Sequence, residues 1–264
     1  NEVPAFWQAG ILAVQIQYTA AERVTLLNGS NALQSEQKDT ICQTFGLPEN
    51  RVTVMGTGYN SDIFYPDPQI KASRTDGKTR LIFAGKLSEK KGLFSLLRAL
   101  RLLRHPEKYE LALAGGYGNA IEYAEICRLA EAAPCQVTFL GKLSHPELAR
   151  QMNASDAFIL PSFYEGLPLV LIEAMACGLK TVCTDLPGIR PWLDRTIPQG
   201  GTIFVTPPRM FNEDEPYPED LEIFEQRLAE AIESLKHRHS ADLNLVRRVS
   251  WSALCEKLIS IWNE

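Results

Sequence analysis

Residues 157–178 decide the expected fold, and they read AFILPSFYEGLPLVLIEAMACG. The four apolar residues from Ala157 to Leu160 are typical of a short strand that is buried on both faces. A polar turn follows, and the apolar stretch from Leu169 to Cys177 has the length of a helix. Pro168 suits the first turn of that helix, and Gly178 is placed to end it. The stretch therefore predicts a strand, a loop and a helix.

The rest of the chain repeats this alternation. Further strand-like runs occupy residues 23–27, 52–55, 80–84, 110–114, 136–140, 181–183 and 202–205. Further helix candidates are residues 93–103, 120–132, 146–152, 221–235 and 251–262. Alternating strands and helices predict an α/β fold, with a parallel sheet flanked by helices and right-handed crossovers. Ligands of such sheets bind beyond the carboxyl ends of the strands.

Length and composition exclude several classes of protein. The chain has 264 residues, 45% of them apolar and 22% charged, which is ordinary for one large or two small globular domains. No apolar run approaches the ~18 residues of a membrane span. A net charge of −5 does not suggest a nucleic-acid partner. The six cysteines form no CxxC pair and are expected to be reduced core residues of a cytosolic protein, without zinc.

Two carboxylates bracket the turn before the helix at residues 169–177. The N-terminus of that helix is expected to face the carboxyl end of the preceding strand, where its free N–H groups favour an anion. Glu165 precedes the helix, and Glu173 lies inside it among apolar residues. An ionised Glu173 there needs hydrogen-bond donors, and a ribose diol supplies two. The alternative is that Glu173 lies on the wet face of the helix.

A second block, residues 83–92, follows a strand and opens an amphipathic helix. It contains Lys86, Lys90 and Lys91. Two cations at such a turn, Lys86 and Lys91, suit a diphosphate, whose charge they would stabilise as it leaves. The alternative is a set of solvated lysines at a helix start, which is the interpretation we favour for Lys90. The acidic run at 213–215 lies in a Pro-rich loop and predicts no metal site.

The segment EGLPLVLIEAMACG resembles the Glu-x7-Glu signature of retaining glycosyltransferases of family 4, which have the GT-B fold. The resemblance implies that Glu165 contacts the donor sugar and Glu173 the nucleotide ribose. It also implies the fold: a Rossmann-like parallel sheet, the C-terminal domain of a GT-B protein, with a remnant of the N-terminal domain. Pro161 and Ser162 ahead of the segment match the family too.

Other blocks resemble the same family. Lys86 stands where the family has Arg, which removes a bidentate fork, whereas Lys91-Gly92 is intact. Weaker matches, each also compatible with an ordinary turn, are residues 56–60 with Phe64 and Pro66, residues 113–118, and residues 139–143. The chain departs from the family at residues 179–181 and 188–191.

The resemblance implies a set of site residues. Those expected at the reaction itself are Glu165, Lys86 and Lys91. Those expected to bind the nucleotide sugar are Gly58, Gly85, Lys86, Lys91, Gly115, Lys142, Leu143, Glu165, Gly166, Leu167, Pro168, Leu169, Val170 and Glu173. No metal and no cofactor are expected, and the donor would be a UDP-, GDP- or ADP-sugar.

The resemblance also implies a division of the chain. Residues 1–46 would be the tail of a truncated N-terminal acceptor domain, and residues 47–248 the donor domain. Residues 249–264 would be a helix that packs back toward the N-terminal domain. The family's catalytic His belongs to the missing half, and no matching motif surrounds His105, His145, His237 or His239. The chain alone is therefore expected to be inactive.

The expected function is transfer of a sugar, with retention, from a nucleoside-diphosphate sugar to an unknown sugar or lipid-linked acceptor in polysaccharide or glycoconjugate synthesis. The main alternative is a non-catalytic nucleotide-sugar-binding module. An NAD-dependent dehydrogenase would need GxGxxG after the first strand. A GT-B epimerase would share the fold without the Glu-x7-Glu turn. The expected location is cytoplasmic, and peripheral contact with the inner face of a membrane stays open.

Overall fold

The computed structural model describes residues 30–32, 35–54, 56–72, 77–212 and 214–263. Its main element is a six-stranded sheet with the order β5-β4-β3-β6-β7-β8, in which every neighbouring pair is parallel. The strands are β3 (Thr79–Ala84), β4 (Tyr109–Ala114), β5 (Gln136–Gly141), β6 (Ala157–Leu160), β7 (Lys180–Thr184) and β8 (Ile203–Val205). The predicted parallel α/β fold is confirmed.

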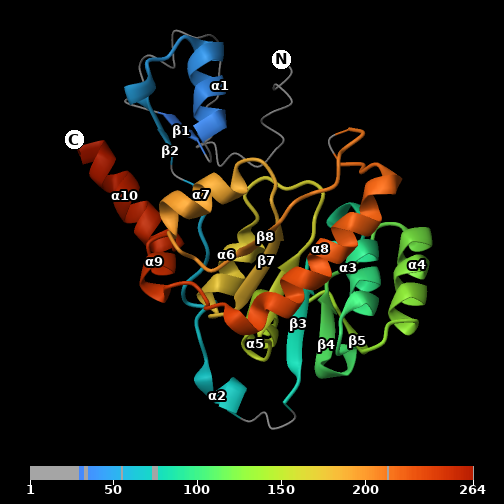
Figure 1. Cartoon of the computed structure of the whole chain (residues 1–264). Coiled ribbons are helices and arrows are strands. Elements are labelled where there is room, and N and C mark those ends of the chain that lie inside the picture. Colours follow the sequence, from blue (N-terminus) through green and yellow to red (C-terminus); the bar gives the residue numbers. More distant parts are fainter. Residues whose placement is uncertain (1–29, 33–34, 55, 73–76, 213, 264) are drawn as a thin grey trace.

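Helices cover both faces of this sheet (Figure 1). One face packs against α3 (Leu93–Ala99), α4 (Ala120–Glu131) and α8 (Leu221–Ser234). The other packs against α5 (His145–Asn153), α6 (Leu169–Ala176), α7 (Ile189–Thr196) and α9 (Leu243–Arg247). Both faces are covered by apolar side chains, so the inner strands are largely buried and read as nearly continuous apolar runs, whereas the edge strand β5 is only partly buried.

The strand order reverses between β3 and β6. The strands β3, β4 and β5 follow one another outward, and the chain then returns to place β6 beside β3. In open parallel sheets, ligands bind at such a reversal, beyond the carboxyl ends of the strands. Of the two blocks singled out in the sequence, residues 83–92 begin with the last two residues of β3, and residues 161–168 directly follow β6.

The helix α6 ends as the sequence predicts. Gly178 has φ +78°, and its N–H donates to Met175 O at 2.9 Å. The next N–H, of Leu179, donates to Ala174 O at 3.1 Å. These two bonds form the Schellman arrangement, which favours glycine. Pro168 lies one residue before the helix rather than in its first turn.

Two predictions at the element level need correction. The strand at residues 52–54, β2 (Val52–Val54), does not join the main sheet but pairs in parallel with β1 (Ser30–Ala32). With α1 (Ser35–Phe45) it forms a small unit, which Figure 1 draws beyond the carboxyl end of the main sheet. The proposed strand at residues 23–27 lies outside the described residues. The division at residue 46 stays a prediction.

The second correction is the helix α7, which is absent from the predicted helices. Ile189, Trp192 and Leu193 of this helix are buried against the sheet. Pro191 is tolerated because it lies in the first turn, where its missing N–H would have no helical partner. The remaining α-helices are α2 (Pro68–Ala72), which precedes β3, and α10 (Trp251–Asn263), which ends the described chain.

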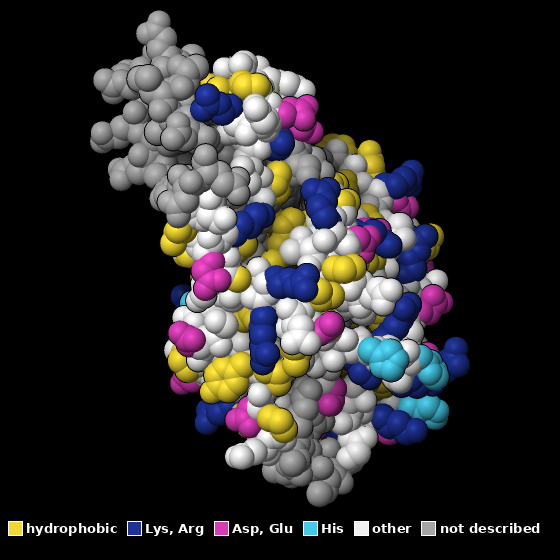
Figure 2. All heavy atoms as spheres, turned by 90° about the vertical axis from the view of Figure 1, so that its left-hand side faces the viewer, with side chains coloured by type: hydrophobic (Ala, Val, Ile, Leu, Met, Phe, Trp, Pro, Cys, Tyr) yellow, Lys and Arg dark blue, Asp and Glu magenta, His cyan; other side chains and the backbone are white. Residues whose placement is uncertain are grey.

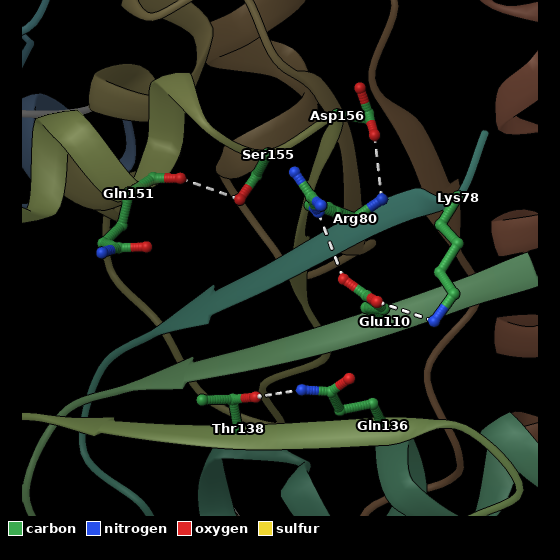
Figure 3. Close-up of polar contacts among 8 residues, drawn as sticks. All are labelled: Lys78, Arg80, Glu110, Gln136, Thr138, Gln151, Ser155 and Asp156. Atoms are coloured by element: carbon green, nitrogen blue, oxygen red, sulfur yellow. Dashed lines mark hydrogen bonds and ion pairs between the residues drawn. The ribbon is translucent and has the colours of Figure 1, made fainter. Parts of the chain in front are cut away.

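Polar contacts join β3 to its neighbours near the amino ends of the strands (Figure 3). Glu110 accepts from Lys78 Nζ at 2.8 Å and from Arg80 Nε at 3.1 Å. The Arg80 N–H donates to Asp156 Oδ2, at the start of β6, at 2.8 Å. These contacts hold the edge opposite to the candidate ligand edge.

Gly92 lets the turn after β3 pack closely against the loop after β6. Gly92 has φ +70°, and a Cβ at this position would lie 2.0 Å from Pro161 O. Gly77 has nearly the same φ, +68°, but no atom within 4 Å of such a Cβ. The two positions therefore share backbone strain but differ in packing.

We predict that Gly92→Ala lowers the free energy of unfolding by about 3 kcal/mol, because left-handed strain and overpacking add. Gly77→Ala is the matched control, with strain alone and an expected loss of about 1 kcal/mol. Urea unfolding of both variants measures the difference. Equal losses would show that the contact with Pro161 is not a tight constraint.

Candidate functional site

The centre of the candidate site is an ion pair between the two blocks. Lys91 Nζ lies 2.7 Å from Glu165 Oε1, and the two side chains are 29% and 15% exposed. The same Glu165 oxygen accepts from Ser162 Oγ at 2.7 Å. Lys91 also donates to Tyr164 O at 3.4 Å. The structure therefore brings together a cation and a carboxylate that are 74 positions apart in the sequence.

The other predicted lysines lie against the glycine-rich loop after β4. A Cβ on Gly118 would meet Lys86 Nζ at 3.0 Å, and a Cβ on Gly116 would meet Lys142 Cε at 2.4 Å. Both lysines are exposed. Lys86 thus extends toward the loop after β4, whereas Lys91 of the same turn extends toward the loop after β6. The structure gives the two predicted diphosphate cations different neighbours.

Glycines let these turns approach one another. A Cβ on Gly115 would lie only 1.8 Å from Gly85 O, so the turns after β3 and β4 are in backbone contact. The Gly85 N–H donates to Ala114 O at 3.0 Å, and the Gly115 N–H donates to Gly141 O at 2.7 Å. The carboxyl edge is therefore a continuous row of backbone turns.

Glu173 is the second predicted carboxylate, on α6. Burial raises its pKa, and the charge of a protonated His145 would lower it. No hydrogen bond to the Glu173 carboxylate is found among the described residues, although the residue is half-buried. His145 begins α5 at an exposed position, and its ring centroid lies 6.0 Å from that of Phe64.

The remaining predicted residues divide into open and packed positions. Gly166 is exposed, with open space where a Cβ would lie, and Leu169 is 44% exposed. Leu143, Leu167 and Val170 are half-buried, and Pro168 is buried. Gly58 is buried, and a Cβ there would meet the Trp251 ring at 2.8 Å and Leu254 at 2.9 Å. The structure thus gives Gly58 a packing contact with α10.

Two contacts were not predicted from the sequence. Ser162 was noted only as a flanking match, yet its hydroxyl holds Glu165; its position three residues before the carboxylate was the available signal. Lys90 was interpreted as solvated, but its Nζ lies 2.5 Å from Asp214 Oδ2. The Lys90 side chain is 56% exposed, in line with that interpretation, but its pairing with Asp214 was not predicted, because an ion pair across 124 positions leaves no local pattern.

Charge is mixed on the face shown in Figure 2, where Lys and Arg side chains stand among Asp and Glu side chains. Within the described ranges, no group of three or more His, Cys, Asp or Glu side chains is arranged to hold a metal ion. In the same part of the chain, no helix combines the length and the apolar character that crossing a membrane requires.

Known proteins share this fold and sequence pattern. The chain is 25% identical over 282 residues to alpha-maltose-1-phosphate synthase from Mycolicibacterium smegmatis, with 98% of this chain and 69% of the relative covered. Sucrose-phosphate synthase from Thermosynechococcus elongatus superposes with a TM-score of 0.58 at 20% identity, covering 91% of this chain and 60% of that one. Anabaena HepE, in complex with UDP and glucose, superposes at 0.57 and 18% identity, covering 92% and 68%.

The matched length is partial. The chain spans between 41% and 69% of the length of the first curated relatives that it matches. These likenesses to solved structures show the fold, which is that of GT-B glycosyltransferases. Residues 67–209, more than half of the chain, match the family described as glycosyl transferases group 1. The chain therefore belongs to the glycosyl transferases group 1 family.

Proposed function

We propose that this chain is the donor-binding part of a retaining glycosyltransferase that uses a nucleoside-diphosphate sugar. The observation that carries the proposal is the Lys91–Glu165 pair at the strand reversal, 2.7 Å apart, in a member of this family. A cation for a phosphate and a carboxylate for sugar hydroxyls are both placed at the edge where parallel sheets bind ligands. The UDP bound by HepE supports this donor class.

In the chain without donor, the charges of Lys91 and Glu165 offset each other. A bound donor can supply a new partner to each of these two side chains. A diphosphate would take the Lys91 ammonium, with Lys86 as a second cation, and sugar hydroxyls would donate to the released Glu165. Ser162 keeps the Glu165 carboxylate in place during this exchange because its hydroxyl donates to the same oxygen. The site is thus arranged before the donor arrives, which lowers the cost of ordering it.

The reaction then depends on charge. The bond between the anomeric carbon and the diphosphate oxygen breaks, and its electron pair stays on the diphosphate. The acceptor hydroxyl oxygen then bonds to the anomeric carbon on the same face, and its proton passes to the departing diphosphate. Lys86 and Lys91 would stabilise that charge, which is the role a metal ion has in other transferases. Glu173 would accept hydrogen bonds from the ribose hydroxyls, which supply the donors that its half-buried carboxylate lacks among the described residues.

The residues described above are proposed to bind the donor and not the acceptor. A sugar or lipid-linked acceptor, and a role in polysaccharide or glycoconjugate synthesis, are part of the proposal because of the family. So is a cytoplasmic location, which the buried Cys177 and Cys183 support as core thiols. Because the chain spans only part of its relatives, we expect it to bind the donor without transferring the sugar by itself.

The raised pKa of Glu173 predicts a dependence of stability on pH. The folded chain binds the Glu173 proton more tightly than the unfolded chain, so stability falls as the pH rises through the raised pKa. We expect Glu173→Gln to be more stable than the wild type at pH 7, with the difference vanishing below the ordinary glutamate pKa. Chemical unfolding at several pH values measures this.

Glu147→Gln is the control with the opposite sign. Hydrogen bonds from Ser144 lower the Glu147 pKa, so its contribution is present at neutral pH and is lost as the pH falls through that lowered value. This variant should be less stable than the wild type at pH 7. A Glu173→Gln variant that is also less stable at pH 7 would contradict the desolvated, unpartnered carboxylate.

Calorimetry with UDP, GDP and ADP tests the donor site. We expect one nucleotide to bind, and Glu173→Ala or Lys91→Met each to weaken it at least about tenfold, which is about 1.4 kcal/mol. Lys78→Met is the matched control, because Lys78 is also paired with a glutamate, at 2.8 Å, but at the opposite edge of the sheet. Absence of binding by the folded wild type to all three would contradict a donor site that is complete in this chain.

A further inference from the structure

A hairpin from the acidic, Pro-rich segment reaches the turn that carries Lys91. The Phe211 N–H donates to Glu215 O at 2.8 Å, and the Tyr217 N–H donates to Arg209 O at 2.9 Å. At the tip, Asn212 Oδ1 accepts from the backbone N–H groups of residues 214 and 215. These bonds join the two arms of the hairpin, residues 209–212 and 214–217, on either side of residue 213, which lies outside the described residues.

The base of the hairpin is fixed to the element that precedes α8. Arg209 donates to both oxygens of Asp220, at 2.7 and 3.0 Å. From there α8 packs against α3, and its Phe224 ring lies 5.6 Å from the ring of Phe163 in the loop after β6. The hairpin is therefore attached to the same body as the candidate site.

The tip of the hairpin holds Lys90. Asp214 Oδ2 lies 2.5 Å from Lys90 Nζ, and this hydrogen bond is the main reason why the Lys90 pKa is raised. The two side chains are 30% and 56% exposed, so the pair adds little to overall stability. Its consequence is geometric, because the contact attaches the hairpin to the turn at the residue next to Lys91.

The backbone of Lys90 holds the other side of the turn. Lys90 O accepts from the Phe163 N–H at 3.0 Å, which joins the turn after β3 to the loop that carries Ser162 and Glu165. The next side chain, Lys91, then reaches Glu165 at 2.7 Å. Asp214, Lys90 and Phe163 thus form a continuous chain of contacts that ends beside the ion pair of the site.

Lys90 also offsets negative charge. The carboxylates of Glu122 and Glu215 act on both Lys90 and Glu89 through their charge. The Lys90 ammonium thus stands among carboxylates, and its pairing with Asp214 acts on the position of Lys91 without requiring Lys90 to touch the donor.

We propose that Lys90 and Asp214 are a positioning pair for the donor site. Asp214, presented by the hairpin, holds the Glu89–Lys91 turn so that Lys91 faces Glu165, and neither Asp214 nor the Lys90 side chain contacts the donor. This inference rests on the proposed function for its effect on donor binding. The effect on the turn itself does not, and it can be measured without a ligand.

The experiment uses the whole chain with Asp214→Asn, Lys90→Met and Lys90→Arg, and Lys78→Met as the control. Hydrogen exchange of the Phe163 amide, followed by NMR, measures the link between turn and loop. Calorimetry measures the nucleoside diphosphate that the wild type binds. We expect Asp214→Asn and Lys90→Met each to speed the exchange and to weaken binding by about fivefold, whereas Lys90→Arg stays near the wild type.

The double variant Asp214→Asn/Lys90→Met shows whether the two residues act through their mutual contact or each affect donor binding separately. If the pair acts as one unit, the double variant weakens binding no more than either single change. Additive losses, or unchanged exchange and binding in both single variants, would overturn the proposal. Tighter binding by Asp214→Asn would also overturn it, since a released Lys90 would then be a donor ligand.

Failure of the proposed function has a different signature. If the folded wild type binds no UDP, GDP or ADP, the donor site is refuted, and the Phe163 exchange rates still decide whether Asp214 holds the turn. If the wild type binds and only the exchange prediction fails, the donor site stands and the positioning pair is refuted.

Discussion

The backbone contact between the turn after β3 and the loop after β6 is the constraint on which the candidate site depends. Gly92 leaves no room for a Cβ beside Pro161 O, and Lys90 O accepts the Phe163 N–H. These contacts involve main-chain atoms, so they fix the relative position of the two segments more firmly than long side chains can. The Lys91–Glu165 pair follows from this position.

Electrostatics at the carboxyl edge distinguish two kinds of carboxylate. The Glu165 carboxylate accepts hydrogen bonds from Lys91 and Ser162 in the free protein. Glu173 has its pKa raised by burial and finds no hydrogen-bond donor among the described residues. In the proposed function, the first carboxylate exchanges partners when a donor binds, whereas the second gains partners. The free chain therefore carries a closed pair and an unpaired acceptor a few residues apart in one motif.

Much of the architecture could be predicted from the sequence. Buried strands of a parallel sheet are short apolar runs, because both faces are covered, and the runs of β3, β4, β6, β7 and β8 were located that way. The run of β5 was located by the same pattern, although this edge strand is only partly buried. Gly178 was recognised as a helix end because the left-handed conformation there favours glycine. β2 was placed in the wrong sheet, because an apolar run does not indicate which strand it pairs with. The α7 helix was missed because Gly188 and Pro191 resemble a loop.

The sequence by itself determined the fold class, the family resemblance and the residue types of the candidate site, because these depend on local periodicity and on a continuous motif. Only the tertiary structure decided which side chains meet. It paired Lys91 with Glu165, sent Lys86 toward Gly118, placed Gly58 against α10 and tied Lys90 to Asp214. The physical reason is range: a helix or a turn is fixed by neighbours in the chain, whereas these contacts join segments that only the packing of the sheet and its helices brings together.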